Sequence, residues 1–308
     1  MLMMETLATK LIPTALFVAA ALLVFAILRL TNYIHRRYGG DPFPTDGLIR
    51  EPAYTKRRRQ RALEVDIFWH AVAVPTLLLA WNYSFMRGLS GGQIVDFSGY
   101  VLIAAAGGAT LAYFIQHLVR LISEKRHLVL QTSAEVATGQ SINQLMRRGY
   151  WVFHDVVLGK QQIQHLIIGS TGVFVVASKA HRVPRKLVRS KTDRAEANFD
   201  GEQLTYPDWV DTDPIQAVLR QSQMLGKWLS GKIGEAVTPQ PVLALPGWYV
   251  QSSDWKRVIV CDPSNPTLII KASRQTRLDS TAIRGILENL KKQTRDSALQ
   301  IPAPQVPQ

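Results

Sequence analysis

The long apolar runs of the chain are concentrated in its first 119 residues. Three of these runs are almost free of charge: Leu11–Leu28, Ile67–Met86 and Tyr100–Val119. At about 1.5 Å per helical residue, each is long enough to cross a hydrocarbon layer of roughly 30 Å. The pattern predicts three transmembrane helices, at about residues 11–30, 67–86 and 100–119.

From His127 onward, apolar and polar positions alternate with the periods of a mixed α/β domain. The helical period predicts helices at residues 133–148, 214–230 and 280–292. Runs rich in β-branched and aromatic residues predict strands at 151–158, 162–168, 173–178, 242–245, 257–261 and 267–270. Gly169–Gly172 should join two of these strands as a hairpin. This order predicts a mixed central sheet.

The patterns divide the chain into four parts. They are a membrane anchor (residues 1–127), a globular domain (128–250), strands and a helix that complete it (251–295), and a disordered tail (296–308). The tail is rich in proline and holds few residues that a core would bury. Cys261 is the single cysteine, so an intramolecular disulfide is excluded.

Basic residues are distributed unequally over the flanks of the apolar runs. The loop 31–66 holds eight Lys or Arg, including the run 56–59, whereas the loop 87–98 holds only Arg87. Basic loops stay on the cytoplasmic side. The flanks therefore predict a multi-pass protein of a bacterial inner membrane, with the N-terminus outside and the C-terminal domain in the cytoplasm.

The third apolar run carries small residues at a spacing of four, Ala104, Gly108 and Ala112. Such a stripe lets a second helix approach closely. Packing within a three-helix bundle and formation of a homo-oligomer explain it equally well. The formal charge of the whole chain is +13, so the lipid bilayer and nucleic acid, DNA or RNA, are both suitable polyanionic partners.

A series of short stretches in the globular part forms a family pattern. The stretches are Glu135, Gly139-Gln140, Asn143–Met146, Gly149–Asp155, Gln162–His165, Gly172–Val176, Asp200-Gly201, Pro214–Ala217, Arg220-Gln221 and Pro241–Trp248. In this order they resemble the nuclease-related domain (NERD) family. The resemblance implies an α/β restriction-endonuclease-like fold of the PD-(D/E)XK nuclease superfamily, here preceded by the three transmembrane helices.

The resemblance also implies where an active site would lie. In such nucleases a helix glutamate, a strand aspartate and an E-x-K motif surround divalent metal. Here the aspartate position is Gln164 and the E-x-K motif reads Ala177-Ser178-Lys179, so the remnant catalytic residues are Glu135, Gln164 and Lys179. Two missing carboxylates leave a poor site for a hard cation, and no metal site is assigned. Mg²⁺ or Mn²⁺ is expected only if the protein cleaves.

A relocated carboxylate is the alternative that would preserve cleavage. Asp155, Glu196 and Asp200 are the candidates. The sequence does not place them relative to Glu135, so an active metal-dependent nuclease stays open beside a domain that has lost efficient cleavage.

The strongest signal for nucleic acid is the segment 179–194, with seven Lys or Arg against one Asp. The candidate phosphate-binding residues are Lys179, Arg182, Arg185, Lys186, Arg189 and Lys191, with Gln216 and Arg220 on the following helix. Such contacts give salt-sensitive, sequence-tolerant binding. Anionic lipid headgroups are the rival partner of this segment.

Three functions follow from these patterns. The first is a membrane-anchored nuclease-related protein that binds nucleic acid at the cytoplasmic face, with cleavage weak or lost. The second is an active nuclease with a relocated carboxylate. The third is a membrane protein-interaction scaffold that binds no nucleic acid.

Overall fold

The computed structural model describes residues 50–90, 97–158, 161–181, 195–252, 256–273, 275 and 277–300. Two compact units are present in it. The described residues of the first unit are 59–90 and 97–126, and the other described residues belong to the second unit.

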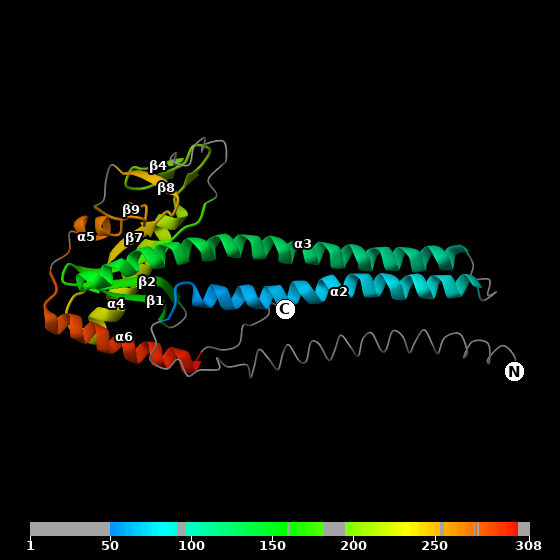
Figure 1. Cartoon of the computed structure of the whole chain (residues 1–308), viewed down its shortest axis with the longest axis horizontal. Coiled ribbons are helices and arrows are strands. Elements are labelled where there is room, and N and C mark those ends of the chain that lie inside the picture. The colour runs from blue at the N-terminus through cyan, green and yellow to red at the C-terminus, as the bar shows by residue number, and fades with distance from the viewer. Residues whose placement is uncertain are drawn as a thin grey trace. The chain divides into compact units, whose positions relative to one another are not determined.

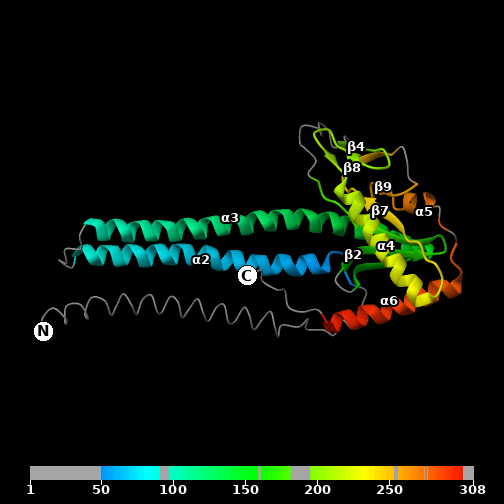
Figure 2. The ribbon, with the colours of Figure 1, turned by 180° about the vertical axis from the view of Figure 1, so that it is seen from behind.

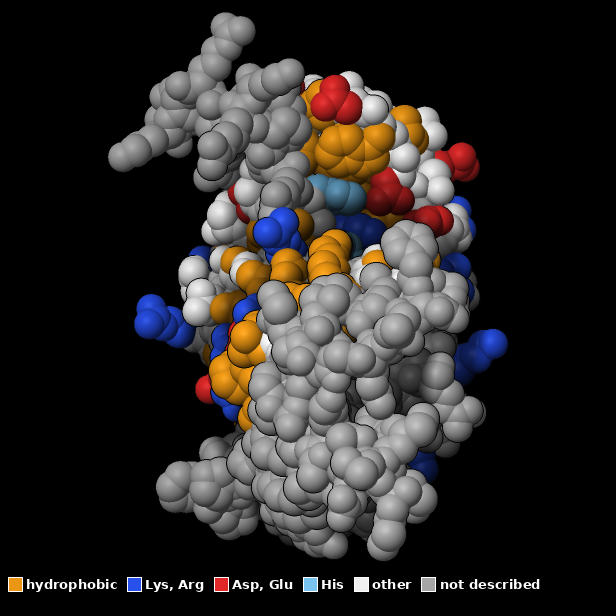
Figure 3. All heavy atoms as spheres, turned by 90° about the vertical axis from the view of Figure 1, so that its right-hand side faces the viewer, with side chains coloured by type: hydrophobic (Ala, Val, Ile, Leu, Met, Phe, Trp, Pro, Cys, Tyr) orange, Lys and Arg blue, Asp and Glu red, His pale blue; other side chains and the backbone are white. Residues whose placement is uncertain are grey.

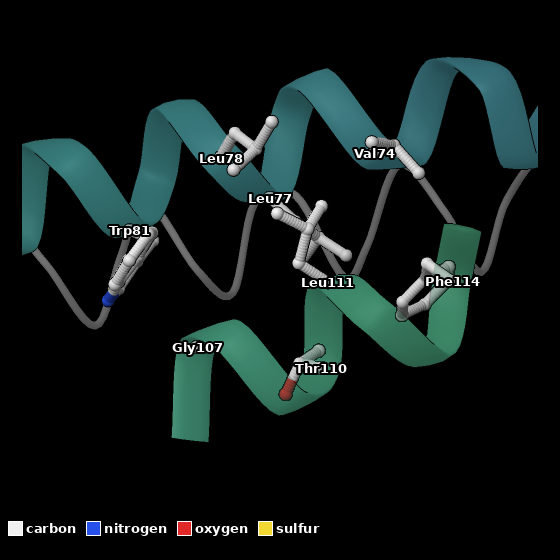
Figure 4. Close-up of a pocket in the computed structure, with 8 residues that line it drawn as sticks. All are labelled: Val74, Leu77, Leu78, Trp81, Gly107, Thr110, Leu111 and Phe114. Atoms are coloured by element: carbon white, nitrogen blue, oxygen red, sulfur yellow. The ribbon is translucent and has the colours of Figure 1, made fainter. Parts of the chain in front are cut away.

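The first unit consists of parts of two long helices, α2 (Tyr54–Ser90) and α3 (Phe97–Ile142), which run side by side (Figures 1 and 2). Arg59 pairs with Glu124, and Lys125 Nζ lies 3.2 Å from Glu64 Oε1. Further along, mainly apolar side chains of both helices line a hollow (Figure 4). A Cβ on Gly107 would lie 2.6 Å from the Trp81 ring, so glycine permits the close approach there.

Within the described residues, one helical segment is long and apolar enough to cross a membrane, Tyr54–Trp81, with a mean hydropathy of 1.5. Residues 100–119 are helical in α3, but the described part of α3 does not meet the same criterion. The expected span 11–30 lies outside the described residues. The structure therefore shows one candidate span instead of the three predicted. A single such helix is weak support for a membrane protein.

The basic run 56–59 was expected in a loop, but it is helical because α2 begins at Tyr54. Lys and Arg are good helix formers, so a helix can continue past its apolar window into a charged segment. Helix α3 likewise continues from the expected third span into the globular unit and ends at Ile142. The 3₁₀-helix η1 (Asn143–Arg148) follows and stops at Gly149, whose φ of 82° favours glycine.

A five-stranded mixed sheet forms the centre of the second unit, in the order β1-β2-β3-β7-β9. The strands are β1 (Trp151–Leu158), β2 (Gln161–Gly169), β3 (Gly172–Ser178), β7 (Gln240–Ala244) and β9 (Ile259–Cys261). The first three are antiparallel, and β7 and β9 continue parallel to β3. The predicted mixed sheet and the hairpin Gly169–Gly172 are confirmed.

Each face of this sheet has its own hydrophobic core. On one face, Ile163, Val175 and Leu243 pack with residues of α4 (Asp213–Ile233) and α6 (Ser280–Gln300). Figure 2 shows α4 crossing in front of the strands. On the other face, Phe174 and Val242 pack with the end of α3, with η1 and with α5 (Thr267–Lys271). The sheet is therefore covered by helices on both sides.

A second, four-stranded sheet was not predicted. Its order is β6-β5-β4-β8, with β4 (Ala195–Phe199), β5 (Leu204–Thr205), β6 (Val210–Asp211) and β8 (Trp248–Ser252). The inner residues Ala197, Phe199 and Trp248 are buried in the same core as α4. Two of these strands have only two residues, which is too short for a periodic signal.

Two predicted elements differ at the C-terminal end. Residues 267–270, expected as a strand, form the short helix α5 after Pro266. A four-residue apolar run does not distinguish strand from helix, and only the packing of Ile269 into the core decides it. Helix α6 extends to Gln300 and so includes residues 296–300, the start of the expected tail.

Candidate functional site

Glu135, the helix glutamate of the remnant site, is fully buried near the end of α3. Its Oε2 lies 2.7 Å from the ammonium of Lys56, in the first turn of α2. The Lys56 side chain is 20 % exposed. Burial raises the pKa of Glu135, and the attraction of Lys56 only partly opposes this. The surviving acid is thus a buried carboxylate held by a lysine that sequence motifs did not identify.

Asp155, one candidate for a relocated carboxylate, is buried on β1 next to this pair. Its charge contributes to the raised pKa of Glu135, so the two carboxylates influence each other. Asp155 Oδ2 accepts hydrogen bonds from the backbone N–H and the hydroxyl of Thr55, both at 2.7 Å. Gln162 Nε2 donates to Oδ1. Both oxygens of Asp155 are therefore engaged.

The backbone at Asp155 has a φ of 55°, a left-handed conformation that is uncommon for aspartate. Arg50 donates to the Asp155 carbonyl oxygen at 3.1 Å. The other two candidates, Glu196 and Asp200, are exposed at the second sheet. Asp200 Oδ1 accepts from the N–H groups of Glu202 and Gln203, as a turn residue does. Of the three, Asp155 is the one that neighbours Glu135.

Gln164, where the resemblance predicts an aspartate, bonds across the sheet to the end of β3. Its Oε1 accepts the backbone N–H of Ser178. Ala177 packs against the hydrophobic core and supplies no ligand atom. The Gln164 side chain is therefore occupied by a hydrogen bond to the backbone, and Ala177 offers no polar side-chain atom.

Lys179 follows β3 directly, and its backbone N–H donates to the Ala244 carbonyl oxygen at 3.0 Å. Its ammonium lies 3.9 Å from Asp211 Oδ2 on β6, and its side chain is 38 % exposed. His181 Nε2 lies 3.5 Å from the same carboxylate oxygen. Lys179 is therefore paired with Asp211 of the second sheet.

Aromatic rings surround this ion pair. Tyr206 and Trp209 stack with centroids 4.5 Å apart, and His181 packs against both rings. Trp248 Nε1 donates to the His181 carbonyl oxygen at 3.3 Å. Burial lowers the pKa of His181. Figure 3 shows histidine, acidic and hydrophobic side chains together at the surface in the upper part of the view. These contacts hold Lys179 and His181, the first residues of the segment 179–194, against the second sheet.

A buried histidine pair links β1 and β2 close to Glu135. His154 Nδ1 and His165 Nδ1 lie 2.8 Å apart, and His154 Nε2 lies 2.9 Å from Asn143 Oδ1. Ser178 Oγ lies 3.4 Å from His165 Nε2. Burial lowers the pKa of His154 to about 4 and that of His165 well below its usual value. Both rings are neutral at pH 7, so one donates its Nδ1–H to the other.

The remaining sequence-based candidates are not drawn into this cluster. Gln216 and Arg220 are exposed on α4, whose buried stripe faces the core. Their neighbour Gln221 instead approaches β2, where its Nε2 lies 3.4 Å from the Gln162 carbonyl oxygen. Five basic candidates lie outside the described residues: Arg182, Arg185, Lys186, Arg189 and Lys191.

The donor atoms do not fit a divalent metal site. The Glu135 carboxylate faces Lys56, Asp155 is saturated by hydrogen bonds, and Gln164 is bonded to the backbone. In the part of the chain that the structure describes, no three His, Cys, Asp or Glu residues are grouped so that they could hold a metal ion. Mg²⁺ demands near-octahedral oxygen coordination that includes one or two free carboxylates, and Glu135 and Asp155 are both already engaged.

Comparisons with known proteins give one match. Searches of curated proteins and of solved structures returned no match. Residues 131–246 match the family described as nuclease-related domain, NERD. This interval contains Glu135, Asp155, Gln164 and Lys179, whereas Lys56 lies outside it. The match supports the NERD family for this part of the chain and, with it, a function related to nucleic acid.

Proposed function

We propose that the second unit binds the phosphate backbone of DNA or RNA and that metal-dependent cleavage is weak or lost. The observation that carries the proposal is the separation of the two remnant charges. Glu135 is buried against Lys56, whereas Lys179 is partly exposed at the head of the basic segment 179–194. A binding cation is thus retained without an acidic metal site.

The Lys179–Asp211 pair is suited to exchange with a phosphate. Its N···O distance of 3.9 Å is long, and an ion pair this exposed contributes about 0–1 kcal/mol. A phosphate oxygen can therefore replace Asp211 at little cost. Basic side chains after Lys179 add counterion release, which favours any polyanion and weakens with salt. Arg182, Arg185, Lys186, Arg189 and Lys191 are the proposed contacts, with Gln216 and Arg220 on the exposed face of α4.

Membrane attachment is part of the proposal. Segment Tyr54–Trp81 has the length and composition of a span, and its large apolar side chains are not packed away. Phe68 is 57 % and Leu79 is 69 % exposed, which is unfavourable in water. We place the protein in a bacterial inner membrane by three spans, with residues 128–295 in the cytoplasm. Ala104, Gly108 and Ala112 would serve either bundle packing or a homo-oligomer.

Fluorescence anisotropy of the detergent-solubilised full chain with labelled DNA and RNA tests the proposal. Binding should weaken steeply between about 0.05 and 0.2 M salt. Lys179→Glu should reduce affinity at least about threefold, because each lost phosphate contact removes an attractive charge. Lys232→Glu, at an exposed position in the last turn of α4, is the matched control. Absence of salt-dependent binding would overturn the proposal and favour the protein-interaction scaffold.

Cleavage through a relocated carboxylate has one observation in its favour, the proximity of Asp155 to Glu135. A plasmid-nicking assay with Mn²⁺ or Mg²⁺ separates the two functions. Nicking that disappears in Asp155→Asn and in Lys179→Ala would establish the nuclease. Binding without nicking would support the function proposed above.

A further inference from the structure

A short segment before and inside the first turn of α2 packs onto the nuclease-like domain at the remnant site. We call residues 50–56 the N-terminal clasp. Arg50 bonds to the Asp155 carbonyl oxygen, Thr55 donates twice to the Asp155 carboxylate, and Lys56 pairs with Glu135. The clasp lies more than 70 residues before the segment that matches the NERD family. It therefore comes from outside the matched segment.

The fit between clasp and domain is close at Gly139. A Cβ on Gly139 would lie 2.5 Å from Pro52 Cγ and 3.3 Å from His165 Cε1. Ala53 is fully buried and has a φ of 59°, a conformation that alanine rarely adopts. A backbone strained in this way persists only where surrounding contacts determine it. The clasp is thus seated by several independent contacts besides its charges.

The charges at this place are unusual for a protein interior. Glu135 and Asp155 are both buried and influence each other electrostatically. The neighbouring histidines are neutral, so they do not compensate a negative charge. Besides Lys56, the backbone of Ala53 favours the charged form of Glu135. Without the ammonium of Lys56, Glu135 would be a buried carboxylate with no ion-pair partner, which is strongly unfavourable.

We propose that the Lys56 ammonium takes the place of a divalent cation at the remnant site, so that the clasp closes this site from within the chain. A single fixed positive charge balances the one carboxylate that Thr55 and Gln162 do not satisfy. The same contact makes the first turn of α2 part of the folded domain. The loss of the other two acidic ligands, at Gln164 and Ala177, agrees with a +1 charge in place of a +2 charge.

This proposal makes a prediction about metal ions. When Lys56 is shortened, the Glu135 carboxylate loses its counter-ion, while the charge of Asp155 still acts on it. Such a place should then attract a hard cation weakly, in the range of about 1 mM for a site with few ligands. The unchanged chain should not bind the cation, because the Lys56 ammonium repels it.

Thermal unfolding of the full chain in detergent, with and without Mn²⁺, is the experiment. Lys56→Ala should lower Tm by roughly 6–15 °C, because it leaves a buried charge unpaired. Mn²⁺ at about 10 mM, roughly ten times the expected Kd, should raise the Tm of Lys56→Ala by about 3–6 °C. Mn²⁺ should not raise the Tm of Lys56→Ala/Glu135→Gln or that of the unchanged chain. Arg57→Ala, which removes the exposed pair with Glu51, is the matched control with little loss.

Two results would overturn the proposal. One is an equal effect of Mn²⁺ on the unchanged chain, since the site would then take metal beside Lys56. The other is a decrease of Tm in Lys56→Ala that is no larger than the decrease in Arg57→Ala. If Lys56→Ala does not fold, Lys56→Met/Glu135→Met replaces it, because removal of both charges should give Tm within about 5 °C of the parent. Failure of that double variant to fold contradicts the proposal as well.

Discussion

The two ends of the remnant site differ in their surroundings. Glu135 is fully buried and its counter-ion is Lys56 at 2.7 Å, whereas Lys179 is 38 % exposed and its counter-ion is Asp211 at 3.9 Å. A buried ion pair is strongly destabilising when one partner is removed, while an exposed pair is screened and easily exchanged. The difference indicates that removal of one partner should cost much more stability at Glu135 than at Lys179.

The largest effect should come from breaking the buried pair at one side. Lys56→Met should lower the free energy of unfolding by about 3–5 kcal/mol, because Glu135 is left as an unpaired buried charge. Lys56→Met/Glu135→Met should recover most of that loss, since a buried pair often exchanges neutrally for apolar residues. Urea unfolding followed by circular dichroism measures both. Equal losses in the single and the double variant would contradict this account of the glutamate end.

The buried end should also be sensitive to acid. Burial holds the pKa of His154 at about 4 against 6.5 for the exposed side chain, so the unfolded chain binds the proton first. The stability that this group provides is complete above pH 6.5 and decreases as pH falls toward 4, by up to about 3 kcal/mol. His154→Gln should flatten this part of the pH dependence. Urea unfolding at pH 7, 6 and 5 is the measurement, and parallel curves for both proteins would argue against it.

A smaller effect is expected where the clasp approaches the domain. Gly139→Ala should destabilise by about 1–3 kcal/mol, because its Cβ would overlap Pro52. Gly231→Ala is the control, since a Cβ there meets nothing within 4 Å inside helix α4. That control should be stabilised by up to about 1 kcal/mol. Tm of the two variants decides the comparison, and equal shifts would show that clasp and domain do not fit closely.

The smallest change in stability belongs to the exposed end. Asp211→Asn should change the free energy of unfolding by less than about 1 kcal/mol. It should also raise the affinity for nucleic acid by roughly two- to fivefold, because Lys179 and His181 lose an internal competitor. Anisotropy titrations at low salt detect this gain. Unchanged affinity would mean that Lys179 does not contact phosphate.

Local patterns predicted the elements that have enough residues to show a period. The ends of the strands β1, β2 and β3 were placed within one residue and those of the helix α4 within three, because alternation and the Asp213-Pro214 start are local signals. The strands β5 and β6, with two residues each, have no such period. Segment 267–270 was assigned wrongly, because an apolar run this short fits a helix or a strand equally.

In the candidate site, too, local signals were readable from the sequence and distant partners were not. The sequence predicts Glu135, Gln164 and Lys179 as members of one site from their places in local stretches, and this stays a prediction. Their partners were not found, because Lys56 and Asp211 belong to elements far away along the chain. Asp155 was one of three equal candidates until the fold placed it beside Glu135.

The sequence alone determined the apolar N-terminal runs and the mixed sheet with its hairpin. These follow from neighbours along the chain. Only the tertiary structure decided that Glu135 faces Lys56 and that Lys179 faces Asp211. The reason is physical: burial and the distance between charges arise when distant segments pack together, and these two quantities decide whether a charge stabilises the fold or binds a ligand.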